Sequence, residues 1–136
     1  GERLAPLPLL PPAPALVLRP RVPIATAEAY RAFDAWVARE GRRVRPLDAA
    51  APPAFRDWAE LAPHAENDFE PALFERYPAL ADAKRRLLET GPLFAVLSGS
   101  GAALFAPYAS AAHRDAARAA CAALANADVC PVTAPD

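Results

Sequence analysis

The sequence predicts an α+β fold in which helices cover one face of an antiparallel sheet. Apolar runs bounded by Pro or Gly indicate strands at 15–18, 93–97, 102–106 and 128–132. Helical patterns separate the first strand from the second and the third from the fourth. Four small residues alone join the second and third strands, as in a hairpin. This βαββαβ order, with extra helices inserted after the first strand, is the split βαβ or ferredoxin-like pattern.

The composition bounds the class of protein. The chain has 136 residues, of which 54% are hydrophobic and 23% charged, which suits one soluble domain. Its net charge of −1 provides no basic field for nucleic acid or an anionic membrane. We therefore expect no nucleic-acid or membrane partner, and a cytoplasmic location. Residue 1 is Gly and Met is absent, so we expect a piece of a longer protein.

The first part of the chain combines an extended segment with a helix. Residues 5–14 are rich in proline, which cannot donate to a strand ladder, so we expect an extended connector. Thr26 is expected to cap the first helix and Gly41 to end it. The apolar stripe of this helix consists of Tyr30, Phe33, Trp36 and Val37.

Helix signals continue up to the second strand. Asn67 is expected to cap a helix, and Glu70 three residues later completes a capping box. Pro78 opens the next helix and Gly91 ends it. The buried face of that helix is expected to hold Leu80, Ala83, Leu87 and Leu88. Two further helices are expected around Phe55, Trp58 and Ala62, and from Ser110 to about Leu124.

The most informative motif is the run Ser98-Gly99-Ser100-Gly101 between the second and third strands. Glycine permits backbone at positive φ and the close approach of a ligand. Serine hydroxyls and backbone N–H groups can face an anion. The turn is therefore either a plain hairpin tip or part of a phosphate site. No lysine follows it as in a P-loop, so the residues alone leave both interpretations open.

The residues alone indicate no catalytic group and no metal site. His64 and His113 are solitary, and we interpret them as surface or capping groups. Cys121 and Cys130 lack metal-ligand spacing and are interpreted as small buried or half-buried thiols. Two basic clusters are interpreted as solvated surface, with a phosphate role as the alternative for the first: Arg42, Arg43 and Arg45, and Lys84, Arg85 and Arg86.

Four longer runs carry a resemblance to a known family. Residues 1–8 read Gly-Glu-Arg-Leu-Ala-Pro-Leu-Pro, and residues 22–30 read Val-Pro-Ile-Ala-Thr-Ala-Glu-Ala-Tyr. Residues 67–78 begin Asn-Asp-Phe-Glu-Pro, and residues 97–106 contain the glycine run. In this order they resemble the 4-diphosphocytidyl-2-C-methyl-D-erythritol kinase family of the GHMP kinase superfamily, which acts in non-mevalonate isoprenoid synthesis. The glycine run is common to all GHMP kinases, whereas the Asn-Asp-Phe-Glu-Pro run is more specific.

The resemblance implies an ATP-dependent kinase that uses Mg²⁺ and phosphorylates a hydroxyl of the cytidine diphosphate alcohol. It implies that Ser98, Gly99, Ser100 and Gly101 support the loop around the ATP phosphates. It also implies that Tyr30 contacts the substrate cytosine, with Thr26 close by. A core position in the helix stripe is the alternative for Tyr30.

The resemblance also implies how the chain is divided. Residues 1–14 would connect to a missing N-terminal kinase domain, and residues 15–136 would form the GHMP kinase C-terminal domain. The family's nucleotide loop, catalytic Lys and catalytic Asp have no counterpart in this sequence. We therefore expect the catalytic residues in the missing domain, and an inactive isolated chain. Two alternatives remain: a GHMP kinase of the homoserine or mevalonate type, and a free-standing ferredoxin-like binding module.

Overall fold

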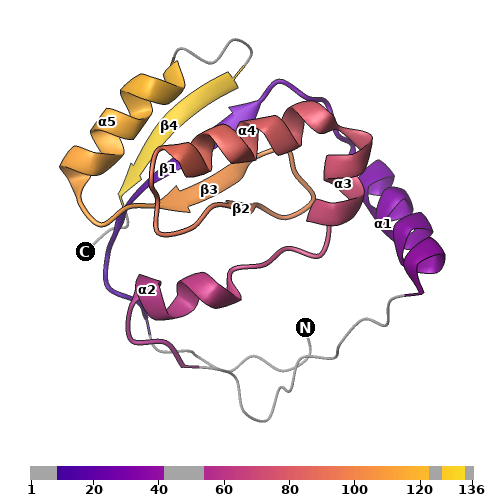
Figure 1. The fold of residues 1–136 in the computed structure, drawn as a ribbon, viewed down its shortest axis with the longest axis horizontal. Helices are drawn as coiled ribbons and strands as arrows, with labels where there is room; N and C mark the ends of the chain where they lie inside the picture. Colours follow the sequence, from indigo (N-terminus) through magenta and orange to yellow (C-terminus); the bar gives the residue numbers. More distant parts are fainter. Residues whose placement is uncertain (1–8, 42–53, 123–126, 134–136) are drawn as a thin grey trace.

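A four-stranded antiparallel sheet organises the molecule. The structure is a computed structural model that describes residues 9–41, 54–122 and 127–133. The strands are β1 (Pro14–Pro20), β2 (Val96–Leu97), β3 (Leu104–Pro107) and β4 (Ala127–Thr133). Their order in the sheet is β2-β3-β1-β4, and every neighbouring pair is antiparallel (Figure 1). This topology confirms the predicted α+β, split βαβ class.

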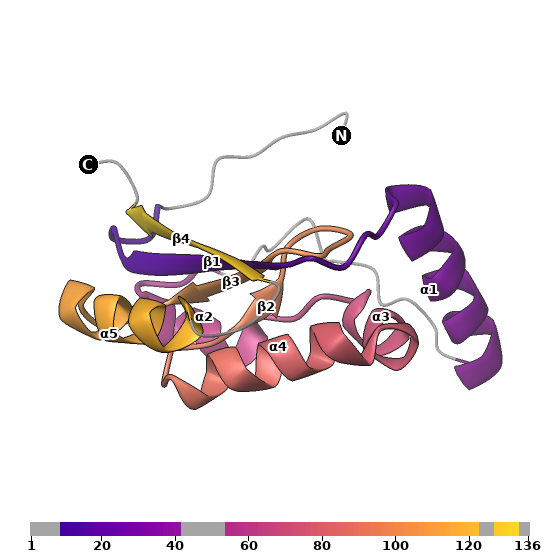
Figure 2. The same ribbon diagram turned by 90° about the horizontal axis from the view of Figure 1, so that it is seen from above.

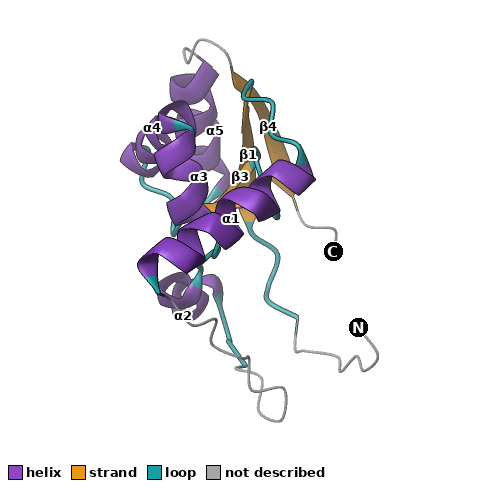
Figure 3. Cartoon of the chain, turned by 90° about the vertical axis from the view of Figure 1, so that its right-hand side faces the viewer, coloured by secondary structure: helices purple, strands orange, loops and turns teal. Residues whose placement is uncertain are grey.

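The helices separate the strands as the pattern predicted. They are α1 (Thr26–Glu40), α2 (Trp58–Leu61), the 3-10 turn η1 (Ala62–His64), α3 (Glu70–Arg76), α4 (Pro78–Glu89) and α5 (Ala111–Ala122). The helices α4 and α5 lie on the same side of the sheet (Figure 2). Figure 3 shows the same two layers from the end of the molecule, with α3, α4 and α5 on one side of the strands. No helix in the described part of the chain is long and apolar enough to cross a bilayer.

The core lies between the sheet and this helical layer. Leu16 pairs with Ala106 and Leu18 with Leu104 across β1 and β3, and all four are fully buried. Side chains alternate along a strand, so these residues share one face. The helices contribute the other half of the core, with Leu73, Leu80, Leu87, Ala117 and Cys121.

The predicted strand bounds differ from those observed around the hairpin. The second strand was expected at 93–97, but β2 holds only Val96 and Leu97. The third was expected at 102–106, but β3 begins at Leu104. The Ser98 N–H donates to the Ala103 carbonyl at 2.8 Å, so the residues between these two form the turn, and Ala102 belongs to it rather than to β3.

Helix α1 corrects two further expectations. Ala25, not Thr26, occupies its N-cap position, and no side chain caps it. Ala29 is its one buried residue among the described side chains, and Tyr30 is 54% exposed. Phe33, Trp36 and Val37 of the apolar stripe are half-buried, because α1 packs against α3 at the end of the sheet rather than on a sheet face (Figure 2).

Several expected features lie outside the described residues. These are the start of the proline-rich connector at 1–8, the cluster of Arg42, Arg43 and Arg45, and the helix end at Leu124. Other local signals are confirmed. Gly41 follows α1 in the left-handed conformation, Pro78 opens α4, and the Ser110 hydroxyl accepts from the His113 N–H at 3.2 Å at the start of α5.

Two adjacent leucines of α4 provide a matched test of this packing. Leu87 is fully buried, whereas Leu88, which was expected in the buried face, is 46% exposed. Leu87→Ala should lower the free energy of unfolding by about 2–5 kcal/mol, because it leaves a cavity in the core. Leu88→Ala should cost about 1 kcal/mol or less. Urea denaturation of both variants measures the difference, and equal losses would contradict the packing described.

Candidate functional site

The turn between β2 and β3, residues 98–101, forms the first part of the site. It lies at the α3 end of the sheet (Figure 1). Gly99 has φ +55° and Gly101 has φ +89°, conformations that L side chains adopt rarely. A Cβ atom on Gly101 would lie 3.4 Å from Leu97 Cδ1 and 3.5 Å from Ile24 Cδ1. Both positions therefore favour glycine, and Gly101 sits close against apolar side chains.

The Asn67 side chain holds this turn from the side of α3. Its Nδ2 donates to the Leu97 carbonyl at 2.7 Å and to the Gly99 carbonyl at 2.9 Å. Its Oδ1 accepts from the Phe69 N–H at 2.9 Å. We expected a reciprocal capping box with Glu70, and this is wrong. Asn67 instead closes a local turn and reaches across the fold to the hairpin.

Glu70 supports the same hairpin with a partly buried charge. Its Oε1 accepts from the Leu97 N–H at 2.8 Å, and its Oε2 pairs with Lys84 Nζ at 2.6 Å. The side chains of Glu70 and Lys84 are only 15% and 19% exposed. Lys84 was expected on the solvated face of its helix, and this is wrong for Lys84. Arg85 and Arg86 are exposed, as expected.

The start of α1 meets the turn from another direction. The hydroxyl groups of Thr26 and Ser100 lie 3.2 Å apart, within hydrogen-bonding distance. This contact joins a residue predicted for the substrate to one predicted for the ATP phosphates. It also occupies the Thr26 hydroxyl that we expected to cap the helix.

Tyr30 lies one helical turn after Thr26 and is not a core residue. Its ring packs edge-to-face on Phe69, with centroids 4.9 Å apart and an interplanar angle of 84°. Phe33 also packs on the Phe69 ring, with the two ring centroids 5.4 Å apart. Half of the Tyr30 side chain is exposed, so the core alternative is wrong. Phe69 follows Asn67 by two residues, so one short segment contacts both the glycine turn and the exposed tyrosine.

The Thr26–Ser100 contact joins five of the six residues predicted for the site, and Tyr30 lies one helical turn after Thr26. The structure adds two residues that the sequence reasoning did not assign to the site. The predicted set is Thr26, Tyr30, Ser98, Gly99, Ser100 and Gly101. Asn67 and Phe69 connect its two halves. The Asn-Asp-Phe-Glu-Pro run had singled them out, but as the start of a helix.

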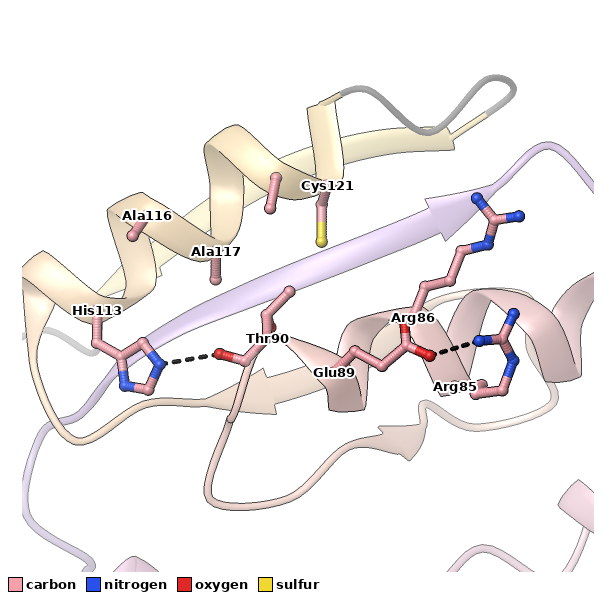
Figure 4. Close-up of a pocket in the computed structure, with 9 residues that line it drawn as sticks. Arg85, Arg86, Glu89, Thr90, His113, Ala116, Ala117 and Cys121 are labelled. Carbon is pink, nitrogen blue, oxygen red and sulfur yellow. Dashed lines mark hydrogen bonds and ion pairs between the residues drawn. The ribbon is translucent and has the colours of Figure 1, made fainter.

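A separate groove lies between α4 and α5 (Figure 4). It has a volume of about 560 Å³, and none of the predicted site residues lines it. Arg85 pairs there with Glu89, and His113 Nε2 lies 2.9 Å from the Thr90 carbonyl at the end of α4. Burial raises the pKa of the Cys121 thiol. These groups are partnered or neutral, and nothing in the groove points to a ligand.

His64 and Cys130 both lie at the surface of the molecule. His64 is exposed, as expected, and its ring lies 5.2 Å from that of Phe55. Cys130 is exposed rather than buried or half-buried, because β4 is an edge strand that turns this side chain to solvent. In the part of the chain that the structure describes, no group of three His, Cys, Asp or Glu side chains is arranged to hold a metal ion.

Ion pairs fix α1 beside α3 and make its attachment sensitive to pH. Glu28 pairs with Arg76 at 2.6 Å, and Arg39 pairs with Glu75 at 2.6 Å. The Tyr77 hydroxyl and the Arg76 guanidinium lower the pKa of the Glu28 carboxyl below its usual value. A lowered pKa in the folded state means that this pair stabilises the fold above the usual Glu pKa. That contribution is lost as the pH falls through the folded-state pKa.

This arrangement predicts a shift in one titration. Tyr77→Phe removes the first of the two groups, so the pKa of Glu28 should rise toward its usual value. NMR titration of the side-chain carboxyl carbon measures it directly. Tyr30→Phe removes a hydroxyl two residues from Glu28 and is the control. It should leave the pKa of Glu28 unchanged. An unchanged Glu28 pKa in Tyr77→Phe would refute this explanation.

Comparison with known proteins gives the family. Residues 50–127 match the family described as GHMP kinases C terminal. The 4-diphosphocytidyl-2-C-methyl-D-erythritol kinase of Prosthecochloris aestuarii is 42% identical over 105 residues, which are 77% of this chain and 36% of the relative. The enzyme of the same name from Rhodopseudomonas palustris is 38% identical over 132 residues, which are 90% of this chain and 43% of the relative.

A solved structure extends the match to the fold. The crystal structure of a 4-(cytidine 5'-diphospho)-2C-methyl-D-erythritol kinase superposes with a TM-score of 0.68 at 27% identity. The match covers all of this chain and 48% of that one. The chain therefore spans less than half the length of each of these three relatives. By its sequence match and its fold, the chain belongs to the GHMP kinase family, within which it corresponds to the C-terminal domain.

Proposed function

We propose that this chain is the C-terminal part of an ATP-dependent kinase acting on 4-diphosphocytidyl-2-C-methyl-D-erythritol in isoprenoid synthesis. The reaction would transfer a phosphoryl group to the 2-hydroxyl of that alcohol, in the cytoplasm. Residues 1–14 would connect to an N-terminal kinase domain, and residues 15–136 would form the C-terminal domain. The observation that carries the proposal is the contact of the glycine turn with the start of α1, one helical turn before the exposed Tyr30 ring.

The glycine turn suits a supporting role at the ATP phosphates. Within the described residues, the N–H groups of Gly99 and Ser100 donate to no backbone carbonyl. Successive N–H groups in a turn with left-handed residues form a concave donor surface for anions. The Ser98 side chain is exposed beside them, and the Ser100 hydroxyl, although near Thr26, can donate as well. These groups would contact the phosphates or the loop that surrounds them.

The described residues do not supply a Mg²⁺ site at this turn. Glu70 is the carboxylate in contact with the hairpin, and it already accepts from the Leu97 N–H and pairs with Lys84. Phosphoryl transfer depends mainly on orientation and on charge stabilisation around the metal and phosphates. We propose that the N-terminal domain contributes the metal ligands, the base and the main nucleotide loop. The isolated chain would then be inactive.

Tyr30 suits the recognition of a flat, aromatic substrate group. Its ring packs on Phe69 and is half-exposed, one helical turn after Thr26, whose hydroxyl contacts the glycine turn. A cytosine ring can stack on such a surface, whereas a small alcohol such as homoserine or mevalonate has no ring to stack. Tyr30 and the names of the relatives favour the cytidine substrate over those alcohols.

A chimeric enzyme tests the proposal. The N-terminal part of the Prosthecochloris aestuarii relative is joined to this chain, and ADP release is measured with the cytidine diphosphate alcohol, homoserine and mevalonate. We expect release with the cytidine substrate alone. A chimera that melts cooperatively but acts only on homoserine or mevalonate would refute the substrate. One that acts on none of the three would refute the kinase assignment.

Substitution of Tyr30 tests the stacking role in the same chimera. Tyr30→Ala should raise the KM for the cytidine substrate roughly 5- to 150-fold, because base stacking on an aromatic ring is worth about 1–3 kcal/mol. The KM for ATP should stay within about twofold. Tyr30→Phe keeps the ring and is the matched control, with a KM near that of the parent. A KM for the cytidine substrate that does not change in Tyr30→Ala would exclude stacking.

A further inference from the structure

The Asn67 carboxamide determines the direction of a peptide group in the glycine turn. In a trans peptide the C=O and the N–H of the next residue point in opposite directions. The Leu97–Ser98 peptide illustrates this, because its carbonyl accepts from Asn67 while the Ser98 N–H donates away from it, to the Ala103 carbonyl. The Gly99–Ser100 peptide is held in the same way through the Gly99 carbonyl. Its N–H, on Ser100, is therefore directed away from Asn67.

The carboxamide itself has a fixed orientation. Its Oδ1 accepts from the Phe69 N–H, which leaves the NH₂ group facing the two carbonyl oxygens. A flipped amide would place Oδ1 against both carbonyls and lose all three hydrogen bonds. Among the side chains of similar size, only an amide supplies two donors and one acceptor in this arrangement. An aspartate would keep the bond to Phe69 but would set a negative oxygen against two carbonyl oxygens.

Neighbouring contacts hold the ends of the turn but leave this peptide to Asn67. Glu70 fixes the Leu97 N–H, before the turn. Thr26 contacts the Ser100 hydroxyl rather than its backbone. A Cβ on Gly99 would meet no atom within 4 Å, so the side of the turn to which a side chain would project is open. The Gly101 N–H donates to the Ser98 carbonyl at 3.1 Å and closes the turn around the Gly99–Ser100 peptide. Of the hydrogen bonds found among the described residues, the one from Asn67 is the bond made by that peptide's own carbonyl.

We propose that Asn67 is a positioning residue that directs the Ser100 N–H toward the phosphates of ATP. This inference rests on the proposed kinase function. Asn67 does not touch the nucleotide, and acts through the backbone of the glycine turn. Its loss removes the bond that sets the direction of the Gly99–Ser100 peptide within the closed turn, so that ATP is bound less tightly or is aligned less well. Tyr30 and the surface for cytosine belong to a different helix and keep their contacts.

The test compares Asn67→Ala and Asn67→Asp with Glu66→Gln in the chimeric enzyme. Glu66 is exposed and adjacent in sequence, and its side chain makes no hydrogen bond or ion pair recorded among the described residues. Two measurements are made: hydrogen exchange of the peptide covering residues 97–103, with and without ATP, and the KM for each substrate. In the Asn67 variants we expect at least tenfold faster exchange and loss of most protection by ATP. The KM for ATP should rise, or kcat/KM for ATP should fall, about tenfold or more. The KM for the cytidine substrate should stay within twofold of the value in the parent chimera.

Three results would overturn the proposal. The first is exchange at 97–103 equal to that of Glu66→Gln. The second is faster exchange with unchanged kinetics toward ATP, or with equal losses for both substrates. The third is loss of cooperative melting in both Asn67 variants, which would make Asn67 a folding residue.

If the parent chimera phosphorylates none of the alcohols, the proposed function fails. Protection of 97–103 by ATP in the parent, and its loss in the variants, then still decides the role of Asn67.

Discussion

The side chain of Asn67 links two parts of the chain that lie about thirty residues apart, and much of the site depends on this link. A net hydrogen bond contributes only about 1 kcal/mol, but a carbonyl away from water, such as the part-buried one of Leu97, costs more when it is left without a partner. The bond to the exposed Gly99 matters for the direction of the turn. The bonds of Asn67 set the start of α3 against the β2–β3 turn. Phe69 and the aromatic residues of α1 are positioned from there.

This dependence explains why a weakly buried helix has a defined place. Helix α1 fully buries only Ala29, and its other inward apolar side chains are half-buried: Ala32, Phe33, Trp36 and Val37. Its position comes from contacts with α3 and the turn: the ring of Phe69, the pairs of Glu28 and Arg39, and the hydroxyl of Ser100. A surface that is fixed yet exposed suits a ligand, because the tyrosine ring is already oriented before binding.

The order of strands and helices could be predicted from the sequence because each element carries a local signal, such as Pro78 at the start of α4 or Gly41 after α1. The environment of Tyr30 could not, since the apolar spacing of a helix does not reveal which neighbour it meets. The capping role of Thr26 failed for a similar reason. Its hydroxyl has a partner, Ser100, that lies seventy-four residues away in the chain.

The glycine turn was ambiguous in the sequence, because a hairpin tip and a phosphate site share the same residues. Family resemblance favours the phosphate site, which we propose, and the structure adds the contacts that hold the turn. The turn is not a free hairpin tip, because Asn67, Glu70 and Thr26 hold it from the helical side. The groove between α4 and α5 has a volume of about 560 Å³ but is lined by none of these residues. The site is thus distinguished by how its groups converge and not by its volume.

The most direct measurement is a crystal structure of the chimeric enzyme with a non-hydrolysable ATP analogue and the cytidine diphosphate alcohol bound together. The account predicts the cytosine ring stacked on Tyr30 and the triphosphate beside residues 98–101, with the Ser100 N–H directed at it. Cytosine bound away from Tyr30, or phosphates remote from the glycine turn, would contradict it.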